Sequence, residues 1–263
     1  MEAACHEARA SPYTSAVQKD EHALQREYWS AADPEHLRWQ TGNAYIAETE
    51  AQLLDQVAAS PGERFLEIGC GEGANLRNLA PRVAGAALFA VDFSLQKAIL
   101  VVSAGVPAAC ADATWLPFAG STFDSVLVRD LLHHVPDRAA VLSEAARVLK
   151  PGGRLTVIEP NGKNPIMAAM ALAIRAERGM LASSPERALA EARAAGLIDL
   201  SVLPRQPLPV SRIVLHYRLG APSLARIPFA RAVLRAVESA ARFLPRPLWG
   251  YFVLRGRRAP RGP

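Results

Sequence analysis

Three glycines, Gly69, Gly71 and Gly73, occupy alternate positions in the stretch Phe65–Leu76. Glycine adopts positive φ angles at little steric cost, and the absence of a Cβ lets its backbone approach a ligand closely. An acidic residue, Glu67, precedes the first glycine by two positions. An apolar run, a glycine turn and a helix start in this order are typical of ligand-binding loops. A dinucleotide-binding fold uses a similar turn, so the loop alone leaves the ligand open.

Short apolar runs alternate with helical patterns from residue 64 onward, which predicts βαβ units and a parallel sheet. Five strands are expected in this part, at Arg64–Ile68, Leu88–Val91, Pro107–Ala111, Phe123–Val128 and Arg154–Ile158. Two more are expected further on, at Leu197–Leu203 and Tyr251–Arg255. The pattern therefore indicates an α/β protein with a doubly wound sheet.

Polar side chains follow the expected strands: Asp92, Asp112, Arg129 with Asp130, and Glu159. In open α/β sheets, ligands bind at the carboxyl ends of the strands. We therefore expect these side chains and the glycine loop to surround one ligand site.

Helix signals lie between and around the strands. Ser94, Asp137 and Ser184 are suitable N-caps, and Ile166–Arg178 is apolar enough for a buried helix. Helices are also expected within Tyr28–Ser60, whereas the first 20 or so residues lack a pattern and are expected to be loosely ordered. Three regions follow: a tail with cap helices at 1–60, a ligand-binding core at 61–204, and a basic helical insertion with the last strand at 205–263.

Composition sets limits on the class of protein. Half of the 263 residues are hydrophobic and 21% are charged, as in globular domains. No apolar run reaches the ~20 residues that span a bilayer, and the N-terminus lacks the order of a signal peptide. The three cysteines suggest neither a disulfide framework nor a metal set, so a cytoplasmic location and no metal are expected.

Positive charge is concentrated at the C-terminal end. Residues 205–263 contain twelve arginines and one acidic residue, Glu238, whereas the preceding part carries a net charge of −6. A basic segment suits a membrane surface, an anionic substrate or nucleic acid. However, only four of the 30 basic residues are lysine, so a general preference for arginine also explains it. Nucleic acid is not expected, because no aromatic–basic stacking pattern is present.

An amphipathic helix is expected over residues 223–244. At about 100° per residue, one face carries arginines and Glu238. The opposite face is apolar and contains Ile227, Ala230, Val233, Leu234, Val237, Ala241 and Leu244. Such a helix either caps the expected ligand site with its apolar face packed on the domain, which we favour, or lies on a membrane surface.

The ordered motifs resemble the class I S-adenosylmethionine-dependent methyltransferases, of the type grouped with ubiquinone and menaquinone methyltransferases. The resemblance covers roughly residues 40–200. The matching segments are Glu67–Gly73, Val91–Ser94, Ala111–Ala113, Leu116–Phe118, Phe123–Asp124, Leu132–Asp137 and Leu149–Gly153. The resemblance implies a Rossmann-like sheet with strand order 3-2-1-4-5-7-6 and an antiparallel seventh strand.

The same resemblance implies S-adenosylmethionine as cofactor and assigns its binding residues. Asp92 would accept the ribose hydroxyls, and Asp112 with Ala113 would meet the adenine. Phe93 would pack on the adenine, together with Leu116. The methionine end would lie near Glu67, Arg129 and the glycine loop, whose backbone includes Cys70. A dinucleotide enzyme also favours an acid at position 92, but Asp112–Ala113 and Leu149–Gly153 favour the methyltransferase.

Candidate catalytic residues remain open. His133 and His134 follow the fourth strand, and one of them is a candidate general base, but a purely structural role for this pair is the preferred interpretation. Glu159 is equally suited to binding substrate and to holding a loop. Cys70 is expected to be a small packed side chain rather than a nucleophile. Methyl transfer depends strongly on positioning and exclusion of water, so a catalytic side chain is not required.

Aromatic residues precede the sheet. Tyr28, Trp29, Trp39 and Tyr45 form either an aromatic lid over the cofactor or ordinary helix packing. The expected function is methyl transfer from S-adenosylmethionine to a small-molecule or lipid-like acceptor. A methyltransferase-like binding module that does no chemistry is the alternative. The intact set of motif residues favours the enzyme.

Overall fold

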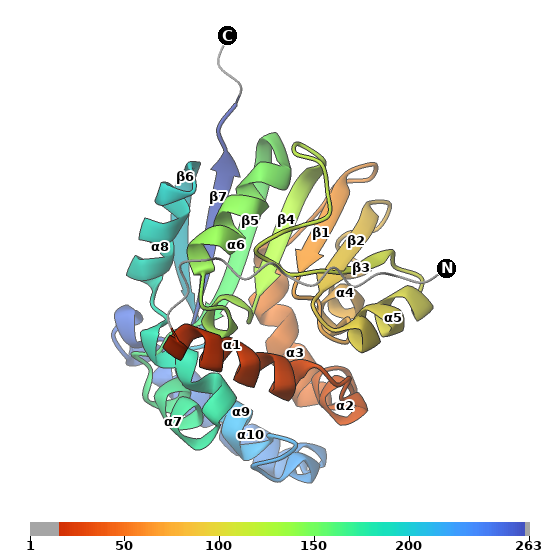
Figure 1. Cartoon of the computed structure of the whole chain (residues 1–263). Coiled ribbons are helices and arrows are strands. Elements are labelled where there is room, and N and C mark those ends of the chain that lie inside the picture. The colour runs from red at the N-terminus through yellow and green to blue at the C-terminus, as the bar shows by residue number, and fades with distance from the viewer. Residues whose placement is uncertain (1–15, 261–263) are drawn as a thin grey trace.

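The structure is a computed structural model that describes residues 16–260. Its centre is one seven-stranded sheet with the order β3-β2-β1-β4-β5-β7-β6 (Figure 1). The strands are β1 (Arg64–Ile68), β2 (Ala87–Asp92), β3 (Ala108–Cys110), β4 (Phe123–Arg129), β5 (Leu149–Pro160), β6 (Leu197–Arg205) and β7 (Tyr251–Arg258). Strands β1 to β5 pair in parallel, and β7 is antiparallel to both β5 and β6. The fold class and strand order expected from the sequence are confirmed.

Ten α-helices lie within the described residues. They are α1 (Ala16–Trp29), α2 (Pro34–Gly42), α3 (Ala44–Leu53), α4 (Ala74–Leu79), α5 (Leu95–Ser103), α6 (Arg138–Val148), α7 (Pro165–Ala173), α8 (Pro185–Ala194), α9 (Ser211–Val214) and α10 (Pro228–Ala240). Six short 3-10 helices join them: η1 (Leu54–Gln56), η2 (Leu132–His134), η3 (Arg175–Ala182), η4 (Pro222–Arg226), η5 (Ala241–Phe243) and η6 (Arg246–Leu248).

The sheet is covered on both faces because successive side chains of a strand point to opposite sides. Leu66 and Ile68 of β1 pack with α6 and α8, while Phe65 packs with α3, α4, α5 and α7. Buried strands of this kind read as continuous apolar runs, as β1 does. The two cores hold the carboxyl ends of β1 to β5 in register.

A third, smaller core joins the N-terminal helices to the C-terminal insertion. It contains Trp39, Tyr45 and Ile46 from α2 and α3, with Leu215 and Leu234 from the insertion. The Trp39 indole N–H donates to the backbone oxygen of Leu215 at 2.6 Å. Regions 1–60 and 205–263 therefore share one core, beyond the carboxyl ends of the parallel strands, where α1, α2, α9 and α10 lie in Figure 1.

Local signals placed the helix starts well. Ser94, Asp137 and Ser184 each accept a hydrogen bond from a backbone N–H in the first turn of the following helix. Each satisfies a helix N–H that has no partner within the helix. Ile166–Arg178, expected as one helix, divides into α7 and η3.

Two expectations near the chain ends need correction. The helix expected over 223–244 is shorter, because Pro228 occupies its first position and η4 precedes it. The unpatterned start was expected to reach residue 20, but α1 begins at Ala16, and only residues 1–15 of that stretch lie outside the described residues. No helix in the described part of the chain is long and apolar enough to cross a membrane.

Candidate functional site

The glycine loop connects β1 to α4 and is tied to β2. The backbone N–H groups of Gly69 and Cys70 both donate to the Val91 carbonyl, at 2.8 and 3.0 Å. Gly69 has φ +74° and Gly71 has φ +52°, conformations that favour glycine. A Cβ on Gly69 would come within 2.9 Å of Leu131, whereas a Cβ on Gly71 would meet nothing within 4 Å. The backbone of Gly71 is therefore the part of the loop that borders open space.

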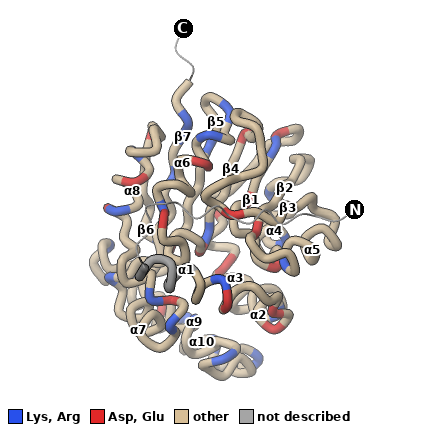
Figure 2. The backbone as a smooth tube through the Cα atoms, viewed as in Figure 1, with Lys and Arg blue, Asp and Glu red and all other residues tan. Residues whose placement is uncertain are grey.

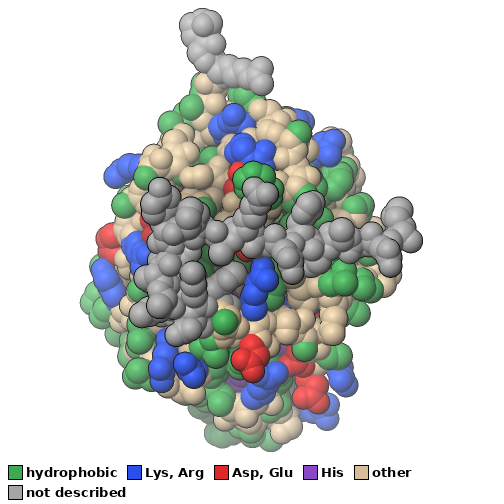
Figure 3. All heavy atoms as spheres, viewed as in Figure 1, with side chains coloured by type: hydrophobic (Ala, Val, Ile, Leu, Met, Phe, Trp, Pro, Cys, Tyr) green, Lys and Arg blue, Asp and Glu red, His purple; other side chains and the backbone are tan. Residues whose placement is uncertain are grey.

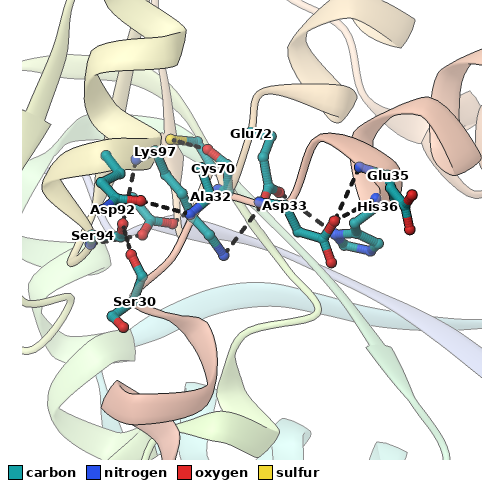
Figure 4. A network of polar contacts seen from close by, with 12 residues as sticks. Ser30, Ala32, Asp33, Glu35, His36, Cys70, Glu72, Asp92, Ser94 and Lys97 are labelled. Carbon is teal, nitrogen blue, oxygen red and sulfur yellow. Dashed lines mark hydrogen bonds and ion pairs between the residues drawn. The ribbon is translucent and has the colours of Figure 1, made fainter. Parts of the chain in front are cut away.

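The carboxylate of Asp92 lies at the end of β2 directly beside this loop. Its two oxygens accept hydrogen bonds from the backbone N–H groups of Gly71 and Ser94, each at 2.9 Å (Figure 4). Burial raises the pKa of the Asp92 carboxyl, although Lys97 and the two N–H groups oppose this effect. The side chain is thus fixed at the strand end, where a carboxylate can accept a diol.

Asp112, Ala113 and Phe93 line the same cavity on its β3 side. Asp112 Oδ1 accepts from the Thr114 N–H and hydroxyl at 2.8 and 2.7 Å. Arg26 of α1 lies 3.8 Å from the other carboxylate oxygen. Leu116, expected to pack on the adenine, is instead buried in the core on the α6 side of the sheet.

Glu67 lies beneath the loop and is fully buried. Asn75 donates to one of its oxygens at 2.6 Å, and the other has no partner among the described residues. Burial raises the pKa of Glu67 to about 8. Glu67 therefore lies behind the cavity wall, and its contact with the methionine end of a cofactor stays a prediction.

The side chain of Arg129 is buried at the wall of the cavity. It forms a buried ion pair with Glu50 of α3, and Arg212 of α9 lies 2.6 Å from the other Glu50 oxygen. Arg129 also donates to Asn75 Oδ1 at 2.7 Å. This cluster links the cap helix, the end of β4 and the C-terminal insertion.

His133 and His134 lie on η2 at the wall of the cavity, and Glu159 lies behind them. Glu159 is fully buried, accepts from the N–H groups of Leu131 and Leu132 at 2.7 and 2.8 Å, and lies 2.7 Å from His133 Nδ1. Of the two roles considered for Glu159, this geometry favours holding the loop.

Cys70 is buried, and burial raises the pKa of its thiol well above the ordinary value, which favours a packed neutral side chain.

Three aromatic residues from the cap helices, Tyr28, Trp29 and Trp39, line the cavity. Tyr45 does not; its hydroxyl donates to Glu238 at 2.8 Å. Trp29 packs against His134, with ring centres 5.1 Å apart. The first three side chains thus lie where the proposed aromatic lid would be, although Trp39 also packs in the third core, and Tyr45 belongs to helix packing.

Sequence reasoning missed a polar network that holds this lid. Glu72 Oε1 accepts from the Asp33 N–H at 3.0 Å and lies 3.7 Å from Lys97 Nζ, and His36 lies 3.5 Å from Glu72 Oε2 (Figure 4). Burial alone would raise the pKa of Glu72, but His36, Lys97 and the N–H group outweigh it and lower the pKa to about 2. The glycine loop is therefore joined to the start of α2.

Glu177 of η3 was also missed. Its Oε2 lies 3.2 Å from His133 Nε2 and 3.8 Å from His134 Nε2. An acidic residue in the apolar stretch 166–178 was the available signal, because a charge within a buried segment requires a partner.

One continuous cavity brings most of the expected site residues together. Its lining includes Gly69, Cys70, Gly71, Asp92, Phe93, Asp112, Ala113, Arg129, His133 and His134. Glu67, Gly73 and Glu159 support it from behind. Beyond the histidines, the cavity extends to Met170, Met180 and Tyr217.

Comparison with known proteins agrees with this geometry. Residues 66–157 match the methyltransferase domain family. The chain is 41% identical over 100 residues to a demethylmenaquinone methyltransferase of Corynebacterium urealyticum, covering 38% of this chain and 43% of that protein. It is 35% identical over 133 residues to a 27-O-demethylrifamycin SV methyltransferase of Amycolatopsis mediterranei, covering 46% and 49%. The chain thus spans less than half the length of these relatives.

Solved structures extend the likeness of the fold over most of the chain. A Haemonchus contortus phosphoethanolamine N-methyltransferase 2 has a TM-score of 0.64 at 21% identity, covering 92% of this chain and 60% of that one. A Thermotoga maritima S-adenosylmethionine-dependent methyltransferase has a TM-score of 0.58 at 20% identity, covering 92% and 99%. Residues 66–157 therefore carry a methyltransferase domain, and most of the chain has the fold of these solved S-adenosylmethionine-dependent methyltransferases. This bears out the family expected from the sequence.

Proposed function

We propose that this protein transfers the methyl group of S-adenosylmethionine to a small, flat and largely apolar acceptor. The observation that carries the proposal is the single cavity that joins Gly71, Asp92 and Asp112 to a chamber beyond His133 and His134. The first part offers the polar groups that suit a nucleoside and an amino acid. The second part is where an acceptor would lie.

Rings and sulfur atoms dominate the acceptor chamber. His36 stacks on Tyr217 with ring centres 5.4 Å apart, and Trp39 lies 5.4 Å from His216. Met170 and Met180 form another part of the wall. Stacked rings and flexible thioethers favour a planar apolar ligand. The relatives named for demethylmenaquinone and 27-O-demethylrifamycin SV make quinol-like acceptors the first compounds to test.

The bound cofactor supplies an electrophilic methyl group on a sulfonium. The protein's contribution is to position both reactants and exclude water. Asp92 and Asp112 would hold the nucleoside, and the lid residues Tyr28, Trp29 and Trp39 would close the chamber. The hydrogen bond from the Asp33 N–H to Glu72 keeps the start of α2 against the glycine loop.

Calorimetric titration with S-adenosylhomocysteine, followed by a turnover assay, tests this proposal. Asp92→Asn should weaken binding by about 10-fold or more, because a buried charged hydrogen bond contributes ~1.5–3 kcal/mol. Release of S-adenosylhomocysteine in the presence of simple hydroquinones and naphthohydroquinones should depend on the acceptor. Binding without turnover across a broad acceptor panel would instead support the silent binding module.

We also propose that the basic insertion makes peripheral contact with a membrane. Helix α10 turns Leu234 and Glu238 inward, where Glu238 accepts from the Ser211 N–H at 2.8 Å. The apolar face expected to pack on the domain does so only in part: Leu234 and Ala241 are buried, whereas Ile227, Val233 and Val237 are exposed. An exposed apolar strip is formed by Ile227, Phe229, Val233, Val237 and Phe243, with exposures of 48%, 78%, 45%, 42% and 94%.

Charge around the strip favours an anionic lipid surface. Arg226, Arg235, Arg242 and Arg246 are exposed on or beside α10, and Figure 2 shows basic residues along this part of the chain. Hydrophobic side chains are also visible at the lower edge of the molecule in Figure 3, where α10 lies. An exposed apolar strip with neighbouring arginines is typical of interfacial helices. Such contact would give the chamber access to a lipid-like acceptor.

Co-sedimentation with vesicles tests the membrane contact. The paired substitution Phe229→Ser and Phe243→Ser should reduce binding to anionic vesicles by about 10-fold or more, because burial of each phenylalanine contributes ~1.5–3 kcal/mol. Trp115→Ser is the matched control, since Trp115 is 78% exposed but follows β3 and lies far from α10 in sequence. Equal sedimentation of the unaltered protein, the paired variant and Trp115→Ser with anionic vesicles would contradict the proposal. Equal binding of the unaltered protein to neutral and to anionic vesicles would also contradict it.

A further inference from the structure

Three potential metal ligands converge on the wall of the acceptor chamber. His133, His134 and Glu177 each offer one ligand atom, and these atoms lie within 4.8 Å of one another. Glu177 Oε2 is 3.2 Å from His133 Nε2 and 3.8 Å from His134 Nε2. Zn²⁺–N and Zn²⁺–O bonds of ~2.0–2.2 Å require ligand atoms about 3–4 Å apart, so the spacing needs little adjustment.

The residue behind His133 completes the pattern seen around metal-binding histidines. Glu159 Oε2 lies 2.7 Å from His133 Nδ1, and Glu159 is itself fixed by two backbone N–H groups. A carboxylate at this position holds the proton on Nδ1 and orients Nε2 outward. His133 therefore presents its second nitrogen to the point where Glu177 and His134 meet.

A positive charge is required at this point. Glu159 and Glu177 are two carboxylates on opposite sides of the His133 ring, and both are buried. Glu177 Oε2 is within hydrogen-bond distance of His133 Nε2, whereas His134 Nε2, at 3.8 Å from the same oxygen, is not. A metal ion would use all three ligand atoms.

We propose that His133, His134 and Glu177 bind one divalent transition-metal ion. Two imidazoles and one carboxylate form a ligand set that suits Zn²⁺, Fe²⁺ or Mn²⁺ and leaves coordination positions open. All three side chains line the cavity, so an open position faces the acceptor. A metal there lowers the pKa of a hydroxyl bound to it, which points to an acceptor that is methylated on oxygen or activated through a hydroxyl. This last step rests on the proposed function, whereas metal binding does not.

The test is metal binding by the full chain after removal of metal with a chelator. Titration with Zn²⁺ should show one saturable equivalent, and titration with Co²⁺ should produce visible absorption bands of a low-symmetry site. His134→Asn and Glu177→Gln should each weaken Zn²⁺ binding by about 100-fold, as expected for loss of a direct ligand. Glu159→Gln, which alters only the orienting group, should weaken it by about 10–100-fold.

His216→Asn is the matched control, because His216 lines the same cavity but lies outside the cluster. In the unaltered protein, His216 Nδ1 accepts hydrogen bonds from the backbone N–H groups of Arg218 and Leu219. The asparagine side chain also has an acceptor for these two groups. This variant should bind Zn²⁺ like the unaltered protein. Binding of S-adenosylhomocysteine reports folding of each variant and tests the cofactor site independently. No saturable Zn²⁺ or Co²⁺ binding, or equal binding by the ligand variants, would overturn the metal site and leave the methyltransferase proposal intact.

Discussion

The Asp92 carboxylate accepts a hydrogen bond from the backbone N–H of Gly71 at 2.9 Å, which ties the end of β2 to the loop after β1. The two residues lie 21 positions apart and are brought together by the parallel pairing of β1 with β2. Asp92 is buried and Gly71 borders the cavity. The acidic group is therefore already oriented before any ligand enters.

This relationship predicts that a side chain at position 71 lowers cofactor affinity by more than its effect on folding stability explains. Gly71→Ala and Gly105→Ala both place a Cβ in open space at positive φ, +52° and +88°. Each should cost about 1–2 kcal/mol of folding free energy, measured by urea unfolding. Only Gly71→Ala should also weaken S-adenosylhomocysteine binding in calorimetry, because its Cβ enters the cofactor space. Equal affinity of the two variants would place the cofactor elsewhere.

Much of the fold could be predicted because its signals are local. The β1 apolar run ends at the glycine loop, and Ser94 is both a strand-end neighbour and a helix cap. The early start of β5 at Leu149 was missed because Pro151 and two glycines read as a turn. Leu149 pairs with Phe123 of β4 and regular pairing resumes at Arg154, so the strand carries an irregularity over the turn-like residues between them.

The supporting contacts of the site could not be predicted, because they join segments far apart in the chain. Glu72 meets Asp33 and Lys97, and Glu177 meets His133, through packing of the cap helices and η3 on the sheet. No short-range pattern encodes these distances. The orientation of α10 was predicted only in part for a related reason: Leu234 packs inward as expected, but Glu238 of the predicted polar face also turns inward, toward Tyr45 of α3 and Ser211 of α9.

The raised pKa of Glu67 predicts an unusual dependence of folding stability on pH. Burial raises the pKa of Glu67 to about 8 in the folded protein, above the ordinary value near 4.5. The folded state therefore holds this proton more tightly than the unfolded state, and stability is lost as pH rises from the lower value to the higher one. Glu67→Gln removes the loss. The melting temperature of the variant minus that of the unaltered protein should increase between about pH 5 and pH 8 and then level off.

Thermal unfolding without added cofactor, in a series of buffers at constant ionic strength, measures this difference. Glu48→Gln provides the comparison, because Glu48 is a half-exposed residue whose partner, Arg235, is also exposed. The melting temperature of Glu48→Gln minus that of the unaltered protein should stay nearly constant across the same pH range. If this difference also stays constant for Glu67→Gln, the buried carboxyl is ionised throughout that range.

The ion cluster around Glu50 should be a major source of cohesion between the cap and the core. Glu50 is 2% exposed and pairs with both Arg129 and Arg212, which come from β4 and α9. Burial alone would raise the pKa of Glu50, but the two guanidinium groups outweigh it and lower the pKa. Glu50→Gln removes the carboxylate that two buried arginines share, and Asp130, 3.4 Å from Arg129, is then the remaining acidic partner of that arginine among the described residues. The expected cost is about 3–5 kcal/mol of unfolding free energy in urea.

Glu48→Gln is again the matched substitution, since Glu48 lies on the same helix and also pairs with an arginine of the insertion. An exposed ion pair contributes about 0–1 kcal/mol, so this change should be small. Hydrogen exchange should locate the effect: in Glu50→Gln, amides of α3 and α9 should lose protection before those of β1 and β4. Uniform loss across the sheet, or equal costs for the two variants, would mean that the third core and not this cluster holds the cap in place.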